Sequence, residues 1–199
     1  MKNILISTGG SGGHVNPALN LFDHFKNNFK TFLVTDLRGL KFIDKEKYTS
    51  KVFDAPRIPK NLLLFPNYIL LLFISIIKAF FFLKKNNINH LISTGGYMSV
   101  PLCIAAKILG INIFLFEPNM FLGRSNNFFL KSAKKIICYS DKIINYPIQY
   151  KNKIFEIKPI LKKSLYLDES AKNKFNKNEI NLLILGGSQG TQFFDSFCE

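Results

Sequence analysis

A glycine-rich stretch near the start of the chain, residues 7–17, carries residue types that bind phosphate and move protons. Four of its glycines fall within five positions and follow an apolar run of strand type. Asn16 and Pro17 then fit the start of a helix, because Asn caps helices and Pro suits their first position. A strand, a glycine turn and a helix start direct backbone N–H groups toward an anion. His14, in the turn, adds a group that can accept a proton.

Two more glycine turns, at residues 95–99 and 186–190, also follow apolar runs of strand length. In an open parallel sheet such turns meet at the carboxyl edge, where ligands bind. One glycine turn alone is a weak indication, since any tight strand-to-helix corner uses glycine. Three turns, each with a hydroxyl or a histidine beside it, favour a shared site. A dinucleotide fingerprint fits poorly because Val15 stands where its third glycine belongs, and no phosphate-binding G-x-x-x-x-G-K-[ST] loop occurs.

The elements that must position these turns alternate between strand and helix. Apolar runs of strand length occupy residues 3–7, 31–35, 51–54, 90–94, 111–116, 135–139 and 154–157. Helical patterns cover residues 17–27, 68–83, 99–109 and 125–133, with Ser99 as a predicted cap. This alternation predicts an α/β fold, a Rossmann-like parallel sheet with helices on both faces.

The chain divides at residues 162–179, which are polar and charged and predict a linker. Residues 1–161 form one predicted domain, and the strand, glycine turn and helix pattern restarts at residues 180–199. A lone strand with part of a helix cannot bury a core of its own. We therefore expect residues 180–199 to open a second Rossmann-like domain that is truncated here.

The composition is both apolar and basic. Hydrophobic residues make up 47% of the chain, and 27 Lys and Arg oppose 13 Asp and Glu, a net charge of +14. This balance suits a membrane surface, a nucleic acid or a phosphorylated substrate, although an AT-rich genome would also enrich Lys, Asn, Ile and Phe. The widely spaced Cys103, Cys138 and Cys198 indicate core positions in a reducing compartment. The N-terminal apolar run is too short for a signal peptide, so we expect a cytoplasmic protein.

The most apolar segment, residues 68–83, is followed by two lysines and interrupted by one. It falls somewhat short of the ~20 apolar residues that cross a bilayer. A buried crossover helix and an interfacial helix are therefore favoured over a true span. The residues expected to meet a membrane surface are Tyr68, Leu72, Phe73, Lys78, Phe81, Phe82, Lys84 and Lys85.

Four stretches carry longer patterns: GGSGGHVNPAL at residues 9–19, STGGYMSVPLCIAAKILGI at 93–111, FEPN at 116–119 and LLILGGSQGTQFFD at 182–195. In this order they resemble the motifs of the MurG family. Members of that family add N-acetylglucosamine to a lipid-linked muramyl pentapeptide in peptidoglycan synthesis, and so serve cell-wall growth, shape and division. The resemblance runs the length of the chain.

The resemblance implies a two-domain GT-B glycosyltransferase that uses UDP-N-acetylglucosamine as donor and lipid I as acceptor, with no cofactor or metal. The N-terminal half would bind the acceptor and an anionic membrane, as a peripheral protein on the cytoplasmic face of the inner membrane. The implied catalytic residues are His14, as the base for the acceptor hydroxyl, and more weakly Glu117. The implied donor-binding residues are Ser11, Gly12, Gly13, Asn119, Ser188, Gln189 and Gly190. The implied acceptor-binding residues are Gly10, His14, Gly95, Gly96 and Tyr97.

The chain also departs from the family pattern. Phe116 replaces a His, Pro118 replaces a Gln, and residues 157–161 keep Pro159 but lack the family's Gly, Asn and Arg. Because a uridine pocket cannot be built from these residues, we expect the chain to be inactive alone. Two alternatives stay open: an acceptor-binding, membrane-associated subunit of a split transferase that pairs with a separate C-terminal-half chain, and a non-catalytic basic protein that binds membrane or nucleic acid. The family resemblance gives no reason to expect a nucleic-acid partner.

Overall fold

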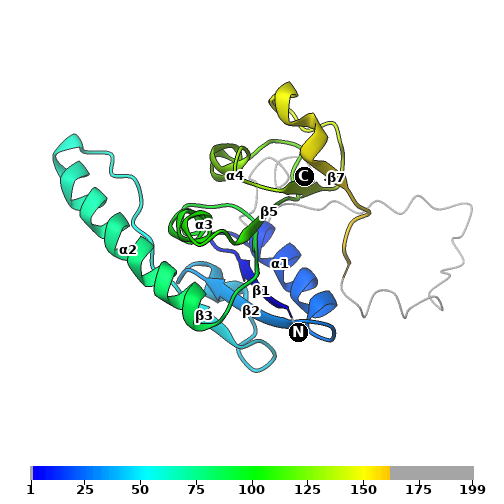
Figure 1. The fold of residues 1–199 in the computed structure, drawn as a ribbon, viewed down its shortest axis with the longest axis horizontal. Helices are drawn as coiled ribbons and strands as arrows, with labels where there is room; N and C mark the ends of the chain where they lie inside the picture. The colour runs from blue at the N-terminus through cyan, green and yellow to red at the C-terminus, as the bar shows by residue number, and fades with distance from the viewer. Residues whose placement is uncertain (1, 162–199) are drawn as a thin grey trace, which may run out of the picture. The chain divides into compact units, whose positions relative to one another are not determined.

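A computed structural model describes residues 2–161 of the chain (Figure 1). The predicted linker, the third glycine turn and Cys198 lie outside the described residues. The strands are β1 (Asn3–Ser7), β2 (Lys30–Thr35), β3 (Ser50–Val52), β4 (His90–Ser93), β5 (Asn112–Glu117), β6 (Lys135–Cys138) and β7 (Ile154–Glu156). The α-helices are α1 (Gly12–Phe25), α2 (Phe65–Lys85), α3 (Ser99–Ile108) and α4 (Arg124–Phe129), and short 3-10 helices lie at Gly39–Phe42, Leu62–Leu64 and Ile148–Lys153.

The strands form one parallel sheet in the order β3-β2-β1-β4-β5-β6-β7. This confirms the predicted α/β fold. Strands of a parallel sheet are buried on both faces, and so their sequences are continuous apolar runs. In β1, Leu5 belongs to the core on one face, while Ile4 and Ile6 belong to the core on the other.

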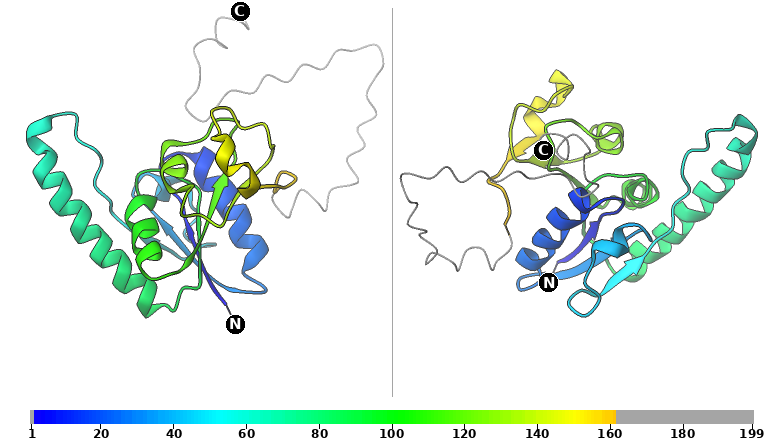
Figure 2. Two further views of the ribbon diagram at one scale, coloured as in Figure 1. Left: turned by 45° about the horizontal axis from the view of Figure 1, so that its top comes forward. Right: turned by 180° about the vertical axis from the view of Figure 1, so that it is seen from behind.

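Helices cover both faces of the sheet (Figure 2). On one face α1 packs through Val15, Ala18 and Leu19. On the other face α3 and α4 supply Leu102 and Phe129. Helix α2 packs on α3 and contributes Ala79 and Leu83 to the same core. Cys103 and Cys138 are buried and unpaired, as predicted, and burial raises the pKa of the Cys103 thiol to about 12.

The start of α1 corrects the sequence prediction. The helix begins at Gly12 rather than Pro17, and extended Ser11 (φ −104°, ψ 163°) is its N-cap instead of Asn16. Pro17 therefore lies inside the helix, where its missing N–H leaves the carbonyl of Gly13 without its helical partner. As a consequence His14 stands in the first turn of α1 and not in a loop.

Two other helix ends differ from their predictions. Helix α4 ends at Phe129, before the expected end at residue 133. The N-cap of α3 is Met98, and the Ser99 hydroxyl instead donates to the carbonyl of Gly96, 2.7 Å away. This bond holds the second glycine turn against the start of the helix that follows it.

Candidate functional site

The two glycine loops within the described residues meet at the point where the strand order reverses. Strands β1 and β4 are neighbours, but β1 is followed in space by β2 on one side and β4 by β5 on the other. The loops after β1 and β4 therefore diverge to opposite sides and leave a crevice at the carboxyl edge, the place where open α/β sheets bind ligands.

A pocket of about 240 Å³ lies between these loops. Its lining consists of Gly9, Gly10, Ser11, His14, Arg38, Gly96, Tyr97 and Met98. Pockets that enclose a whole small ligand usually measure about 300–1,000 Å³. A pocket of this size suits one part of a substrate, such as a phosphate group or a reacting hydroxyl.

The loops can approach each other because particular positions lack a side chain. A Cβ on Gly9 would lie 2.8 Å from both Asp36 Oδ1 and Met98 Cγ, closer than real Cβ atoms come. Gly10 and Gly96 adopt φ of +85° and +83°, a left-handed backbone that favours glycine. The three glycines are therefore required by the geometry of the pocket wall.

The buried carboxylate of Asp36, at the end of β2, fixes both loops. Its Oδ1 accepts hydrogen bonds from the N–H groups of Gly10 (2.9 Å) and Gly39 (2.7 Å), and its Oδ2 accepts from the Tyr97 hydroxyl (2.7 Å). Burial raises the pKa of this carboxyl, but these bonds and nearby Arg38 outweigh it, so the pKa lies below its usual value. Asp36 therefore stays ionised and connects the first glycine loop to the second.

The start of α1 faces the pocket with unpaired polar groups. The first N–H groups of a helix have no partner within it, and here Gly12 and Gly13 begin the helix beside pocket-lining Ser11. The Ser11 side chain makes no capping bond. The buried Nδ1 of His14 has no hydrogen-bond partner among residues 2–161. The N–H groups are free to meet an anion, and the His14 ring lines the pocket with one nitrogen left without a partner in the described part of the chain.

Sequence reasoning placed Gly10, Ser11, His14, Gly96 and Tyr97 in the site, and all five line the pocket. It missed Asp36 and Arg38. The available signal was the position of these two residues immediately after β2, at the same edge as the glycine loops. Gly95 (φ +91°) lies behind the lining, near Asn126.

Glu117 and Asn119 lie outside the pocket lining. The Glu117 carboxylate is buried (1% exposed) and accepts bonds from Asn119 Nδ2 (3.1 Å), the Gly123 N–H (2.8 Å) and Asn126 Nδ2 (3.0 Å). A carboxylate engaged in this way shapes the loop after β5, which favours a positioning role over the weakly predicted catalytic one. Asn119 is exposed, with its amide nitrogen held by Glu117.

The two substitutions beside Glu117 have different surroundings. Phe116 is completely buried and packs edge-on against Tyr139, with ring centres 5.5 Å apart. The side chain at this position therefore belongs to the core. Pro118 is half-buried at the start of the loop. Among residues 2–161, no cluster of three His, Cys, Asp or Glu side chains is arranged to hold a metal ion.

Helix α2 is longer than the helix predicted at residues 68–83, and many of its apolar side chains are exposed. Residues 62–85 pass the length and apolarity criteria for a membrane span, yet only 11% of the most apolar window is buried. The interpretation as a buried crossover helix is therefore wrong. Of the predicted membrane residues, Phe73, Lys78, Phe81, Lys84 and Lys85 are exposed, and Tyr68, Leu72 and Phe82 are half-buried.

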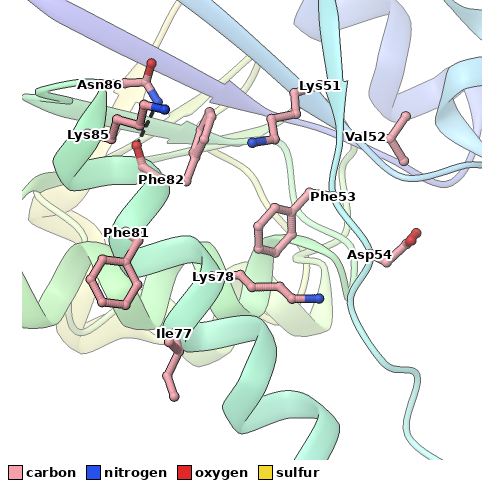
Figure 3. Close-up of a pocket in the computed structure, with 10 residues that line it drawn as sticks. All are labelled: Lys51, Val52, Phe53, Asp54, Ile77, Lys78, Phe81, Phe82, Lys85 and Asn86. Carbon is pink, nitrogen blue, oxygen red and sulfur yellow. Dashed lines mark hydrogen bonds between the residues drawn. The ribbon is translucent and has the colours of Figure 1, made fainter.

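A second, larger hollow of about 650 Å³ lies between α2 and the end of β3 (Figure 3). Lys51 from β3 and Lys78 from α2 border it, and Lys51 Nζ lies 4.5 Å from the centre of the Phe82 ring. Lysines beside exposed aromatic rings suit the boundary between lipid headgroups and acyl chains.

Comparison with known proteins identifies relatives of this chain. Residues 4–138 match the glycosyltransferase family 28 N-terminal domain. A UDP-N-acetylglucosamine--N-acetylmuramyl-(pentapeptide) pyrophosphoryl-undecaprenol N-acetylglucosamine transferase of Pelagibacter ubique is 52% identical over 98% of the chain and 54% of its own length. The enzyme of the same name in Rickettsia bellii is 35% identical over the same shares. The chain thus spans about half the length of these curated relatives.

Solved structures share the fold. The MurG crystal structure from Acinetobacter baumannii superposes with a TM-score of 0.65 at 20% identity, covering 86% of this chain and 50% of that one. A UDP-N-acetylglucosamine 2-epimerase from Rickettsia bellii gives a TM-score of 0.57 at 16% identity over 78% and 44% of the two chains. At these identities the likeness shows the fold alone, one Rossmann-like half of a GT-B architecture.

Proposed function

The chain belongs to the glycosyltransferase family 28 N-terminal domain family, and we propose that it is the acceptor-binding half of an N-acetylglucosaminyltransferase. The proposed donor is UDP-N-acetylglucosamine, and the proposed acceptor is the pyrophosphoryl-undecaprenol-linked muramyl pentapeptide for which its relatives are named. One observation carries the proposal: the first turn of α1, with His14, shares a single pocket with the second glycine loop at the strand-order reversal.

The chemistry is a displacement at the anomeric carbon of the donor sugar. The acceptor hydroxyl oxygen forms the new bond to that carbon, the bond to the leaving diphosphate breaks, and the hydroxyl proton passes to His14. A positioned base of this kind contributes about 10²–10⁴-fold in rate. The unpaired N–H groups of Gly12 and Gly13 are placed to stabilise negative charge on a phosphate.

We propose that α2 rests on an anionic membrane as an interfacial helix. Its exposed apolar residues exceed what a solvated surface carries, and Lys78, Lys84 and Lys85 suit anionic headgroups. Figures 1 and 2 show the segment before α2 running back alongside the helix. That segment carries Asp54 and Arg57, which a spanning arrangement would draw into hydrocarbon at high cost. The proposed location is the cytoplasmic face of the inner membrane.

The relatives' remaining half has no counterpart in these 199 residues. We propose that residues 162–179 form a linker and residues 180–199 begin the donor-binding domain, with Ser188, Gln189 and Gly190 on the donor phosphates. A separate chain could equally supply the donor-binding half, as in a split transferase. Both versions need a second half for turnover.

Transfer of radiolabelled N-acetylglucosamine onto lipid I tests the proposal. The chain is assayed alone and mixed with the complementary half of the Pelagibacter ubique relative. We expect transfer only in the mixture. Transfer by this chain alone would contradict the proposed division of labour. Absence of both transfer and lipid I binding, with membrane binding retained, would instead favour a non-catalytic lipid-binding protein.

A further inference from the structure

Two arginines that the sequence analysis did not select lie over the ring of Tyr97, beside the glycine-loop pocket. The guanidinium carbon of Arg38 is 5.0 Å from the ring centre, and that of Arg57 is 5.1 Å from it. Because both distances are measured to one centre, the two carbons are at most about 10 Å apart, each within cation–π range. Arg38 follows β2, whereas Arg57 stands in the segment between β3 and α2.

This cluster contains more positive than negative charge. Asp36 is its acid, with Oδ2 3.4 Å from Arg38 Nε, but the same carboxylate already accepts hydrogen bonds from Gly10, Gly39 and Tyr97. Within residues 2–161, Arg57 forms no ion pair. Two like charges this close repel each other unless an anion joins them. The cluster therefore has the charge and the free N–H donors to hold one.

The position of the arginines indicates which anion. Arg38 lines the same pocket as His14. Arg57 lies only a few residues before the apolar segment 62–85 along the chain, and the Tyr97 ring that it overlies lines the pocket. A ligand whose apolar part rests with this segment on a membrane can place its charged group at the ring, beside both arginines. The planar guanidinium fork matches phosphate oxygens in a bidentate manner.

We propose that Arg38 and Arg57, aligned on the Tyr97 ring, form a clamp for the diphosphate of a lipid-linked substrate. The guanidinium carbons are at most about 10 Å apart, and in the clamp one diphosphate bridges them. That the ligand is attached to a lipid rests on the proposed function. That the ligand carries a diphosphate rests on the two arginines themselves. Asp36 acts through Tyr97: its bond to the hydroxyl sets the ring on which both arginines lie.

Binding measurements on the 199-residue chain test the clamp with two probes, inorganic diphosphate and undecaprenyl diphosphate in uncharged detergent micelles. The variants are Arg38→Gln, Arg57→Gln and Arg57→Lys. Lys107→Gln, exposed at the end of α3 near the opposite edge of the sheet, removes the same charge as a control. Thermal unfolding of each variant verifies that it is folded.

We expect each Gln variant to bind both probes about 10- to 100-fold more weakly, the loss expected for a charge-assisted hydrogen bond. Arg57→Lys keeps the charge without the fork and should recover only part of the loss. Lys107→Gln should bind like the wild type. Equal affinities for wild type, Arg38→Gln and Arg57→Gln would overturn the clamp, as would a wild type that binds neither probe.

The two probes separate this inference from the proposed function. Arginine-dependent binding of inorganic diphosphate, without binding of undecaprenyl diphosphate, supports the anion clamp and overturns its lipid-linked ligand. Arginine-dependent binding of undecaprenyl diphosphate supports the clamp even if the mixture of halves transfers no sugar, a result that would refute the proposed function alone.

Discussion

Around Asp36, at the glycine-loop edge, polar groups are buried and hydrogen-bonded, whereas along α2 many apolar side chains are exposed. Asp36 is 2% exposed, and its carboxylate is fully hydrogen-bonded within the chain. Eleven large apolar side chains between residues 62 and 81 are exposed, among them Leu63 at 85% and Phe81 at 64%. Both regions reverse the usual placement of polar and apolar groups.

The contrast shows that the hydrogen bonds of the Asp36 carboxylate are made within this chain, whereas much of the apolar surface of α2 is not covered by the described residues. A buried carboxylate is tolerated only when its hydrogen bonds are made, so the framework around the pocket is preorganised before substrate arrives. An apolar surface as large as that of α2 is tolerated when something covers it. In the proposed function the edge supplies the chemistry, and α2 sets where that chemistry takes place. The experiments below separate these two roles.

The largest expected effect belongs to His14. With the complementary half supplied, His14→Ala should lower turnover by about 10²–10⁴-fold, because the acceptor hydroxyl loses its base. Vesicle binding should stay unchanged. Turnover equal to that of the wild type would show that another group takes the proton. His24→Ala, in the last turn of α1, serves as the matched control.

Asp36→Ala should have the next largest effect, on stability. It leaves the N–H groups of Gly10 and Gly39 and the Tyr97 hydroxyl without their acceptor, at a cost of about 1–3 kcal/mol for the buried Gly39 N–H and less for each of the two part-buried donors. Urea unfolding should show a loss of about 3 kcal/mol or more. A loss below about 0.5 kcal/mol, the range of ordinary surface substitutions, would mean that the edge is not held by this carboxylate.

Substitutions on α2 should weaken membrane binding and leave stability nearly unchanged, the opposite of the effect expected for Asp36→Ala. A double substitution of Phe73→Ser and Phe81→Ser should weaken cosedimentation with anionic vesicles by about 30- to 1,000-fold, since each ring contributes roughly 1–2 kcal/mol on burial. Stability in water should be nearly unchanged, because both rings are already exposed. Phe155→Ser, an exposed ring on β7, is the control and should leave vesicle binding unaltered. A large loss of stability in the double variant would place these rings in the core.

The smallest expected effect is a dependence on pH. The pKa of Asp36 is lower in the folded protein, so its contribution to stability is present above the ordinary pKa of 3.8 and disappears as pH falls below it. Urea midpoints between pH 7 and pH 3 should therefore decline more steeply for the wild type than for Asp36→Asn. Parallel declines would show that the carboxylate gains nothing from its partners.

The strands were predictable because parallel strands buried on both faces are continuous apolar runs, and β1 occupies the residues expected for it. The glycine loops were predictable from the turns they make. The start of α1 was not, because Pro17 suits a first helical position better than the interior that it occupies, where a helical hydrogen bond is lost.

The cluster around Tyr97 and the packing of α2 could not be predicted from the sequence, because both depend on how distant segments are placed in space. Asp36, Arg57 and Tyr97 follow β2, β3 and β4, and they meet only after these strands and β1 are placed in one sheet, so no local pattern joins them. The exposure of α2 was hidden because apolar residues look alike whether a protein core or a lipid covers them. The structure distinguishes the two cases because α2 packs mainly on α3 and leaves many of its apolar side chains exposed.

The most direct test of the central claim, that this chain holds the lipid-linked acceptor, is a titration of the 199-residue protein with lipid I in phosphatidylcholine bicelles. We expect saturable binding that inorganic diphosphate competes away, and much weaker binding of UDP-N-acetylglucosamine alone. Tighter binding of UDP-N-acetylglucosamine than of lipid I, or no saturable binding of lipid I, would contradict that claim.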